Sequence, residues 1–275
     1  MRRLRSLFLL VSVMTAVVWP VAAVAPPASA ATNVTIQGTV VCDGDAVQGI
    51  WVENYNGSGN TGKWASWWAY PNRSNAAYYS VTLSSTTSTP KVRLDIGCGG
   101  TRSSWRRTLL SPDFTTRTGY TENRRCIGSH TAANRARVCT PSPRGATSST
   151  NTADRGYCTW GAKEKWKAAV GSYPNLVGNA KNWDDDARSK GFYVSSVPHR
   201  LSMVVWNTSD QYGHVGWVTK VYKKSDGKVY FDSIDMNTGS WVNQGQGTTT
   251  GFGKYQTRTG LAWNPSVQAF IVAPT

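Results

Sequence analysis

Beyond its first two dozen residues, the chain lacks any apolar run long enough to span a membrane. The one long run extends from Leu7 to about Val24, follows three arginines and is followed by Ala28-Ser29-Ala30. A basic start, an apolar middle and small residues before a cleavage site are typical of a secretory signal peptide. A membrane anchor is the alternative, but Pro20 interrupts the run. We expect cleavage after Ala30, secretion to the outside of the cell or its wall, and no stable membrane anchor.

Acidic residues are scarce, with 15 Asp and Glu against 30 Lys and Arg, and the net charge is +15. This excess favours an anionic partner such as nucleic acid, a lipid surface or a wall rich in phosphate polymers, although general solubility would explain it too. The chain has no RGG tract, no RRM-like signature and no zinc-finger spacing, which argues against nucleic acid. We expect no metal and no cofactor.

Cysteines number only five, an odd count that leaves one thiol over after two disulfides. Export implies oxidising conditions, in which cysteines pair. Cys42 closes one predicted strand and Cys98 follows another, so we pair them, and the closeness of Cys126 and Cys139 in sequence makes them the second pair. By elimination, Cys158 is the free thiol.

The chain divides into two parts after the signal peptide (1–30). Residues 31–126 hold short alternating runs separated by turn-rich segments, which predicts an all-β sandwich domain and a candidate binding module. Residues 127–153 contain no acidic residue and few large apolar ones. We interpret them as a linker with a local disulfide. Residues 154–275 begin with helical spacing and continue with strand-like runs, which predicts an α+β domain.

Two clusters allow more than one interpretation. The aromatic stretch KWASWWAY (63–70) suits a platform for stacking sugars, and it equally suits a core strand with one exposed edge. The acidic residues Asp184–Asp186 suggest calcium, but three consecutive helical residues point in different directions, so a solvated helix face is the better interpretation.

Cys158 begins the first predicted helix, directly after Gly156 and Tyr157. A free cysteine is often a buried small hydrophobe. At a helix N-terminus, however, the dipole and the unpaired N–H groups stabilise a thiolate and can donate to an oxyanion. We therefore favour a nucleophile.

A nucleophilic thiol needs a base, and the chain has only three histidines. His130 falls in the linker and His199 in a turn containing proline, whereas His214 begins a predicted strand. If Asp226-Gly227 closes a two-residue hairpin turn, Gly216 pairs with Asn237 and Val218 with Asp235. His214, Asp235 and Asn237 then share one face, which gives a base and its orienting groups.

Five segments in order resemble the CHAP domain, the cysteine- and histidine-dependent amidohydrolase/peptidase family. They are RGYCTWGAKEKW (155–166), GNAKNWDDDARSKGFYV (178–194), VPHRLSMVVW (197–206), GHVGWV (213–218) and SIDMN (233–237). The resemblance covers about residues 154–275 and implies a papain-like fold that cleaves amide bonds in peptidoglycan. It implies Cys158 as nucleophile, His214 as base, Asp235 as orienting acid and Asn237 as a fourth member.

The chain departs from the family pattern at three positions. Tyr157 stands where glutamine usually precedes the nucleophile, Asp235 replaces the usual glutamate, and Leu201 replaces a glycine, which suggests an altered turn. We place Tyr157, Trp160 and Trp183 at the oxyanion or substrate part of the cleft.

These observations predict a monomeric, secreted peptidoglycan hydrolase, either an N-acetylmuramoyl-L-alanine amidase or an endopeptidase. Its expected partners are bacterial peptidoglycan and anionic wall polymers, and not nucleic acid. One alternative is a wall-binding protein with weak or no activity. Another is a secreted amidohydrolase toxin that acts on a substrate outside the wall.

Overall fold

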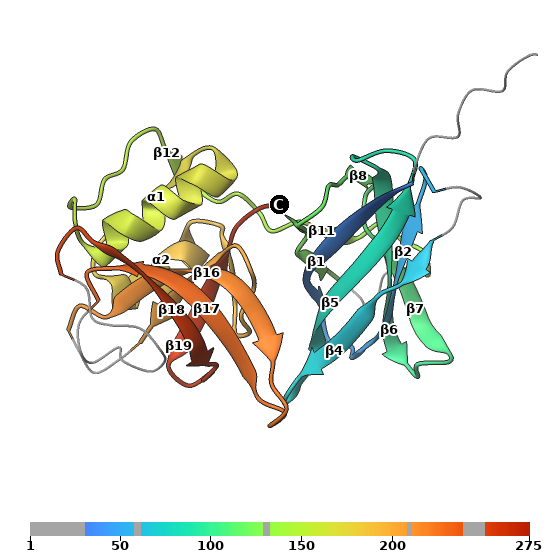
Figure 1. The fold of residues 1–275 in the computed structure, drawn as a ribbon. Coiled ribbons are helices and arrows are strands. Elements are labelled where there is room, and N and C mark those ends of the chain that lie inside the picture. The colour runs from blue at the N-terminus through green and yellow to red at the C-terminus, as the bar shows by residue number, and fades with distance from the viewer. Residues whose placement is uncertain (1–30, 58–61, 129–132, 208–210, 239–250) are drawn as a thin grey trace, which may run out of the picture. The chain divides into compact units, whose positions relative to one another are not determined.

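The computed structural model describes residues 31–57, 62–128, 133–207, 211–238 and 251–275. It is rich in strands and has few helices, as expected (Figure 1). Residues Ala31–Thr275 form one compact unit. Among the described residues, no helix combines the length and the apolar character needed to cross a membrane. The expected signal peptide lies outside the described residues.

Residues 31–140 form two sheets. The first has the strand order β11-β10-β1-β5-β4, with β9 also paired to β1, and the second has the order β3-β2-β6-β7, with β8 also paired to β6. The strands are β1 (Thr32–Cys42), β2 (Val47–Asn54), β3 (Lys63–Trp64), β4 (Ser66–Tyr70), β5 (Arg73–Ser85), β6 (Lys91–Gly100), β7 (Trp105–Leu110), β8 (Phe114–Thr115), β9 (Tyr120–Thr121), β10 (Arg124–Cys126) and β11 (Cys139–Thr140).

The two sheets share one buried core. Ile36 of β1 and Leu83 of β5 belong to the same cluster as Ile50 of β2 and Leu94 of β6. These residues occupy alternate positions of their strands, and that period of two places them on the inner faces. One hydrophobic core therefore stabilises both sheets.

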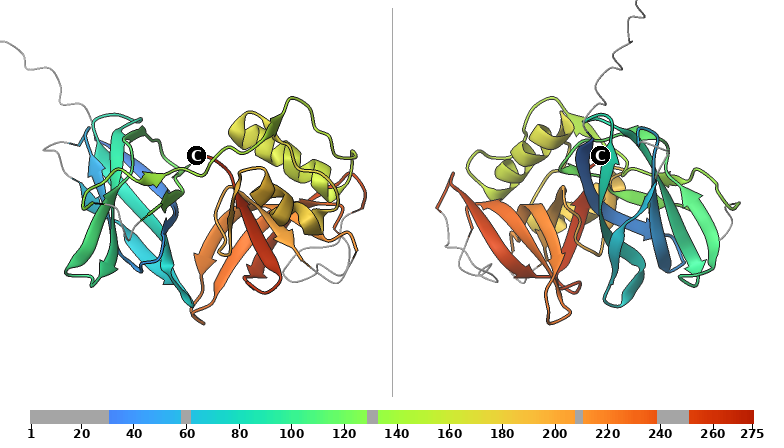
Figure 2. Two further views of the ribbon diagram at one scale, coloured as in Figure 1. Left: turned by 180° about the vertical axis from the view of Figure 1, so that it is seen from behind. Right: turned by 45° about the vertical axis from the view of Figure 1, so that its right-hand side comes forward.

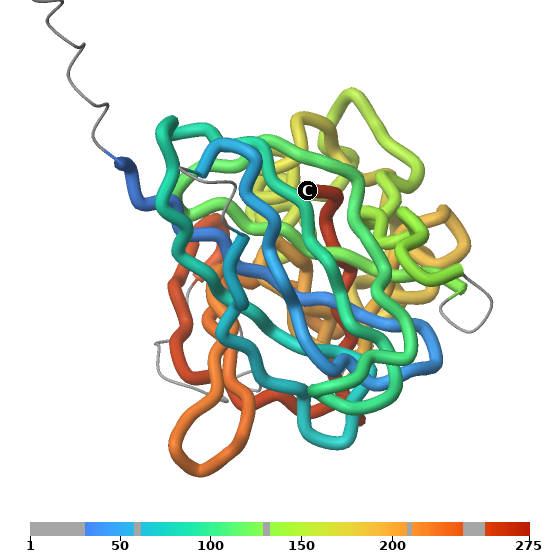
Figure 3. The backbone as a smooth tube through the Cα atoms, turned by 90° about the vertical axis from the view of Figure 1, so that its right-hand side faces the viewer, coloured from blue at the N-terminus to red at the C-terminus, as the bar shows by residue number. Residues whose placement is uncertain are grey.

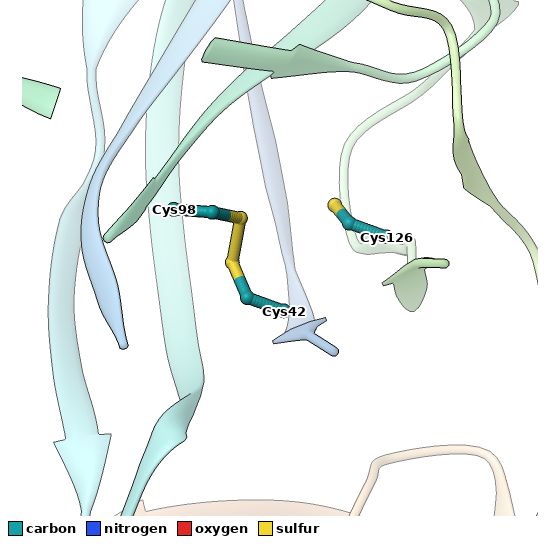
Figure 4. Close-up of side chains that lie close together, drawn as sticks. All are labelled: Cys42, Cys98 and Cys126. Carbon is teal, nitrogen blue, oxygen red and sulfur yellow. A yellow bond between two sulfur atoms is a disulfide. The ribbon is translucent and has the colours of Figure 1, made fainter. Parts of the chain in front are cut away.

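Both predicted disulfides are present, Cys42–Cys98 and Cys126–Cys139. Cys42 and Cys126 are neighbours on the paired strands β1 and β10, and Cys98 bonds to Cys42 from β6 (Figure 4). The sulfurs of Cys42, Cys98 and Cys126 lie within 4.8 Å of one another. Each already belongs to a disulfide, so none of the three offers a thiolate to a metal ion.

The second part, from residue 141, combines a six-stranded sheet with helices, and the sheet has the order β14-β19-β15-β16-β17-β18. The elements are β12 (Thr147–Ser148), α1 (Cys158–Val170), β13 (Tyr173–Pro174), the 3₁₀ helix η1 (Ala180–Asn182), α2 (Trp183–Ser189), β14 (Tyr193–Ser195), β15 (Ser202–Trp206), β16 (His214–Lys223), β17 (Val229–Met236), β18 (Tyr255–Ala262) and β19 (Gln268–Val272).

Helices α1 and α2 pack on the same face of this sheet (Figure 2). Trp166 of α1 and Ala187 of α2 lie in one cluster with Val205, Val215 and Ile271 from three strands. The opposite face carries Val204, Trp206 and Phe231, which belong to a separate cluster. The sheet is therefore buried on both faces, and its strands are correspondingly apolar.

The second cluster also includes Val41, Tyr70 and Ala76 from the N-terminal sheets. The hydroxyl of Tyr70 is buried and donates to the carbonyl of Pro198 at 2.6 Å. Apolar and polar contacts thus both join the two parts of the compact unit. The domain limits at 126 and 153 stay predictions.

Candidate active site

Cys158 is the first residue of α1, as the sequence predicts. Gly156 has a φ of 94°, a left-handed value that glycine adopts freely, and a Cβ there would lie 2.3 Å from the ring of Phe252. Tyr157 then takes extended backbone at the N-cap and makes no side-chain capping bond. This turn places the free and partly exposed thiol at the end of the helix where backbone N–H groups have no helical partners.

Buried Lys163 holds helix α1 to the segments on either side of it in the chain. Its ammonium donates to the carbonyl of Leu176 at 2.6 Å and to the hydroxyl of Thr152 at 2.8 Å. Burial lowers the pKa of Lys163 to about 8. The two bonds tie the segment before α1 and the segment after it to the helix that carries Cys158.

The hairpin of β16 and β17 brings His214 and Asp235, the predicted base and acid, together, but in a different register from the predicted one. Gly216 faces Asp235, not Asn237, and Val218 faces Ser233. The turn is longer than expected: Lys224 and Lys228 close a loop whose last residue, Gly227, has a φ of 77°. This is the three-residue hairpin loop that ends in a left-handed residue, and it is the orange loop at the lower left of Figure 3.

A β-bulge between Val218 and Lys220 adds a second one-residue shift. The two shifts together displace the pairing by two residues. Since side chains alternate with a period of two, Asp235 stays on the face where the sequence placed it. The predicted register was wrong, and the predicted face of Asp235 was right.

Asp235 is buried and contacts three side chains. Its Oδ2 lies 3.4 Å from Nε2 of His214 and 3.3 Å from Nε of Arg258. Its Oδ1 accepts a hydrogen bond from the hydroxyl of Ser233. All three ionisable groups are at most 1% exposed. The carboxylate therefore links the base to a buried guanidinium.

Gly216 provides the space for this carboxylate. It lies directly across the strand pair from Asp235, and a Cβ at Gly216 would come within 2.3 Å of Oδ1. Real side chains do not tolerate such a contact, so any other residue here would displace the acid.

His214 connects Cys158 to Asp235. A side-chain hydrogen bond joins His214 to the thiol of Cys158, and Trp206 packs against the imidazole with ring centroids 5.3 Å apart. As the first residue of β16, His214 reaches Cys158 on the helical side and Asp235 on the other face of the sheet.

The electrostatics favour a thiolate–imidazolium pair. Burial lowers the pKa of His214, but Asp235 and Cys158 outweigh burial and raise that pKa to about 9. For Cys158 burial acts in the opposite direction and raises the pKa, because it disfavours the charged thiolate. The hydrogen bond and the charge of His214, together with the N–H groups of Val215 and Thr159, outweigh it and hold the pKa below its ordinary value. A charged nucleophile beside a proton donor is suited to acyl transfer.

Asn237 differs from its predicted position. Strand β17 ends at Met236, and Asn237 has a φ of 51°, so the alternation of the strand does not extend to it. Its backbone N–H donates to the carbonyl of Lys254 at 3.4 Å. Of the two predicted orienting residues, Asp235 is the one in contact with His214.

The three residues predicted for the cleft occupy different environments. Tyr157 is 49% exposed, and its ring contacts exposed Phe252 edge-on at 5.1 Å. Trp160 is partly exposed and lies under Arg155. Trp183 is 1% exposed and donates to the carbonyl of Gly178. Tyr157 and Trp160 offer surface to a substrate, whereas Trp183 offers almost none.

The other two histidines are separate from this arrangement. His199 is buried, bonds to the hydroxyl of Ser195 at 3.0 Å, and burial alone lowers its pKa to about 3. It is therefore a neutral core residue near neutral pH. His130 lies outside the described residues.

The acidic run at the start of α2 does not converge on one point. Asp184 and Asp185 pair with Arg188, and Asp186 pairs with Lys190. Asp185 is exposed, as a solvated face predicts, whereas Asp184 is buried against Arg188.

Leu201 shows how the chain accommodates its departure from the family pattern. Its φ is 60°, in the left-handed region that glycine prefers. The predicted altered turn is not needed, because Leu201 keeps a backbone conformation that a glycine would adopt.

Sequence reasoning missed Arg258 and the strand that carries it, β18. The middle of this strand, QTRTG, consists of polar and small residues, and its buried apolar residue, Leu261, comes only near the end. It pairs with β17 so that Arg258 faces Ser233. The contact of Phe252 with Tyr157 was also missed. The two residues are far apart in sequence and meet only in the tertiary structure.

Residues 148–237 match the model of the CHAP domain family. This segment contains Cys158, His214, Asp235 and Asn237, and it includes all five of the segments that resemble the family.

Two relatives from Staphylococcus aureus are similar over part of their length. An N-acetylmuramoyl-L-alanine amidase domain-containing protein is 37% identical over 86 residues, which cover 30% of this chain and 14% of that protein. The staphylococcal secretory antigen SsaA is 31% identical over 98 residues, which cover 36% of each. The similar segments thus span 14% of the first relative and 36% of the second.

A crystal structure of N-acetylmuramoyl-L-alanine amidase from Staphylococcus aureus is 27% identical to this chain. The similarity covers 45% of this chain and 33% of that one, and the TM-score is 0.33. Superposition at this level supports no argument about the fold.

The ion pair predicts how the reactivity of Cys158 depends on pH. Thiolate exists above the lowered pKa of Cys158, and imidazolium exists below about pH 9, the pKa of His214. Alkylation by iodoacetamide should therefore extend to lower pH than that of an ordinary thiol. In His214→Ala the alkylation profile should move to higher pH, because the thiolate loses the hydrogen bond and the charge of His214. A variant with the parent profile would contradict the ion pair.

Gly216→Ala should displace Asp235 and thereby lower the pKa of His214. The acidic limb of the alkylation profile should move to higher pH, because the thiolate loses part of its stabilising charge. Gly251→Ala is the matched control, since a Cβ there meets nothing within 4 Å. Identical profiles for the two variants would show that Gly216 does not position the acid.

Proposed function

We propose that this protein is a secreted peptidoglycan hydrolase that cleaves an amide bond of the bacterial wall with Cys158 as its nucleophile. The contact chain from Cys158 through His214 to Asp235 is the observation that carries the proposal. The CHAP domain match supports it, as do the names of the two relatives, one an amidase domain-containing protein and the other a secretory antigen.

The geometry supports a two-step acyl transfer. The thiolate of Cys158 attacks the carbonyl carbon, and the N–H groups at the start of α1 stabilise the oxyanion. His214 gives its proton to the leaving amine as the C–N bond breaks, which leaves a thioester on Cys158. Neutral His214 then takes a proton from water while the hydroxide attacks the thioester. The C–S bond breaks, which releases the carboxylic acid and restores the Cys158 thiolate beside protonated His214.

Asp235 keeps the imidazole oriented and stabilises its charged form. Oδ2 also contacts Arg258, so the carboxylate has a second charged partner that holds it in place. The shorter side chain of aspartate thus suffices at a position where the family usually has glutamate.

We further propose that a papain-like α+β domain follows a β-sandwich. The shared core of the two N-terminal sheets and the two-sided burial of the six-stranded sheet support this division. The excess of positive charge supports retention on anionic wall polymers after export.

Tyr157 favours a second candidate, a wall-binding protein with weak activity. Glutamine usually supplies an oxyanion donor at this position, and the exposed ring of Tyr157 packs against Phe252 instead. The backbone N–H groups of α1 would then be the principal oxyanion donors.

Cys158→Ala removes the nucleophile, and His214→Ala removes the group that moves the proton. Both should abolish the release of soluble wall fragments, with a loss of at least about 10²-fold for His214→Ala. Mass spectrometry of the fragments from the parent identifies the bond, since an amidase frees the lactyl carboxyl of muramic acid, whereas an endopeptidase leaves that bond intact and frees a carboxyl within the peptide. Release by folded Cys158→Ala at the parent rate would refute the enzyme.

Removal of Asp235 should affect more than catalysis. In Asp235→Ala, Arg258 keeps its charge in a site that is 0% exposed, and loss of one partner of a buried pair costs about 3–5 kcal/mol of stability. Asp235→Asn retains the shape but should lower the pKa of His214 and the turnover.

Asn237→Ala should stay close to the parent, because Asn237 lies beyond the end of β17 and its backbone N–H bonds to the carbonyl of Lys254. Thermal unfolding and fragment release, measured side by side, separate the two effects of Asp235. Equal stability of Asp235→Ala and the parent would show that Arg258 does not depend on this carboxylate.

A further inference from the structure

The outer face of the sheet β3-β2-β6-β7 carries three tryptophans in contact, and this face is turned toward the viewer in Figure 3. Trp51 and Trp64 pair across β2 and β3, with ring centroids 5.2 Å apart. Trp105 joins them from the start of β7, with its centroid 5.4 Å from that of Trp64. Ile50 and Val52, which flank Trp51, are 0% exposed, so Trp51 points away from the core.

Glycines allow the indoles to lie close to the sheet. A Cβ at Gly97 would come within 2.2 Å of the Trp105 ring, and one at Gly49 within 2.3 Å. These two glycines face each other across β2 and β6, so Trp105 covers both. Trp64 stands at 88° to Trp105 and is 58% exposed. The indole of Trp105 thus lies against the sheet, and the exposed indole of Trp64 stands nearly perpendicular to it.

The aromatic stretch 63–70 does not act as one cluster. Trp64 belongs to this outer face, whereas Trp67 packs against the core and Trp68 stacks on Tyr78 in the other sheet. The two interpretations of the stretch therefore apply to different residues.

Polar side chains with balanced charge border the tryptophans. The indole of Trp51 donates to Glu53 at 2.9 Å. Asp95, which faces Trp51 across β6, pairs with Arg93 at 2.7 Å and with Arg135 at 3.4 Å. The side chain of Arg135 is 58% exposed. Both of these arginines share the carboxylate of Asp95, so the positive charge beside the tryptophans is partly neutralised and favours a neutral polar ligand over a polyanion.

We infer that the Trp51–Trp64–Trp105 face binds a glycan strand of peptidoglycan. A pyranose has an apolar C–H face that suits an indole, and a rim of hydroxyl and amide groups that suits carboxylates and guanidinium groups. A large exposed indole is also the kind of side chain that dominates binding energy at recognition surfaces. The choice of peptidoglycan as the glycan rests on the proposed function, whereas the tryptophan face is separate from Cys158, His214 and Asp235.

Binding is measured with the full chain carrying Cys158→Ala, so that no wall is digested. The probe is insoluble peptidoglycan stripped of its phosphate polymers, and a soluble hexamer of N-acetylglucosamine serves as competitor. The protein should sediment with the stripped peptidoglycan, and the hexamer should release it. Trp64→Ala should weaken binding about tenfold or more, as expected for a central aromatic contact.

Two further variants complete the test. Trp64→Phe retains a ring and should recover most of the affinity. Ile127→Ala removes an apolar side chain of similar exposure, 51%, from a region outside this sheet, and it should bind like the parent. Thermal unfolding checks that each variant is folded.

Three results would overturn the inference. Trp64→Ala could bind with full affinity, or the parent could bind only walls that retain phosphate polymers. Alternatively, Trp64→Ala could convert a dimer into a monomer without changing wall binding, which would identify a self-association surface. Fragment release by Trp64→Ala with Cys158 intact tests the proposed function separately, because a failure of glycan binding leaves the acyl transfer chemistry in place.

Discussion

The buried carboxylate of Asp235 is the interaction on which the candidate site depends. It lies between the imidazole of His214 and the guanidinium of Arg258, and all three groups are almost inaccessible to water. A buried charge is tolerated only where partners compensate for its lost hydration. Because Asp235 raises the pKa of His214, and His214 in turn lowers that of Cys158, the reactivity of the thiol follows from this one carboxylate.

The backbone around Asp235 is built to admit it. Gly216 leaves the space that the carboxylate fills, the bulge after Val218 and the three-residue turn set the register, and Ser233 holds the second oxygen. His214 begins its strand, so its ring reaches both faces of the sheet. The nucleophile can therefore belong to the helical layer while the acid belongs to the opposite face, and a single histidine connects them.

The outer tryptophan face differs in physical character from the candidate site of Cys158, His214 and Asp235. His214 and Asp235 are buried and Cys158 is partly exposed, and the protonation of these groups controls the proposed chemistry. The tryptophan face is exposed and combines apolar rings with paired charges, which suits a ligand rich in hydroxyl groups. Binding at the exposed face would retain the enzyme on an insoluble substrate while the catalytic groups act on individual amide bonds.

Local signals in the sequence determined much of this protein. The odd cysteine count, the predicted strand ends at Cys42 and Cys98, and the closeness of Cys126 to Cys139 in sequence identified both disulfides and the free thiol. The helical spacing after Cys158 placed that thiol at the start of a helix. The period of two placed Asp235 on the face of His214, and the five ordered segments indicated the family. Only the tertiary structure decided the true register, because a bulge and a turn length depend on the neighbouring strands. It also decided the contact of Arg258 with Asp235 and the meeting of Trp51, Trp64 and Trp105, since residues far apart in sequence come together only when the strands that carry them pair and pack.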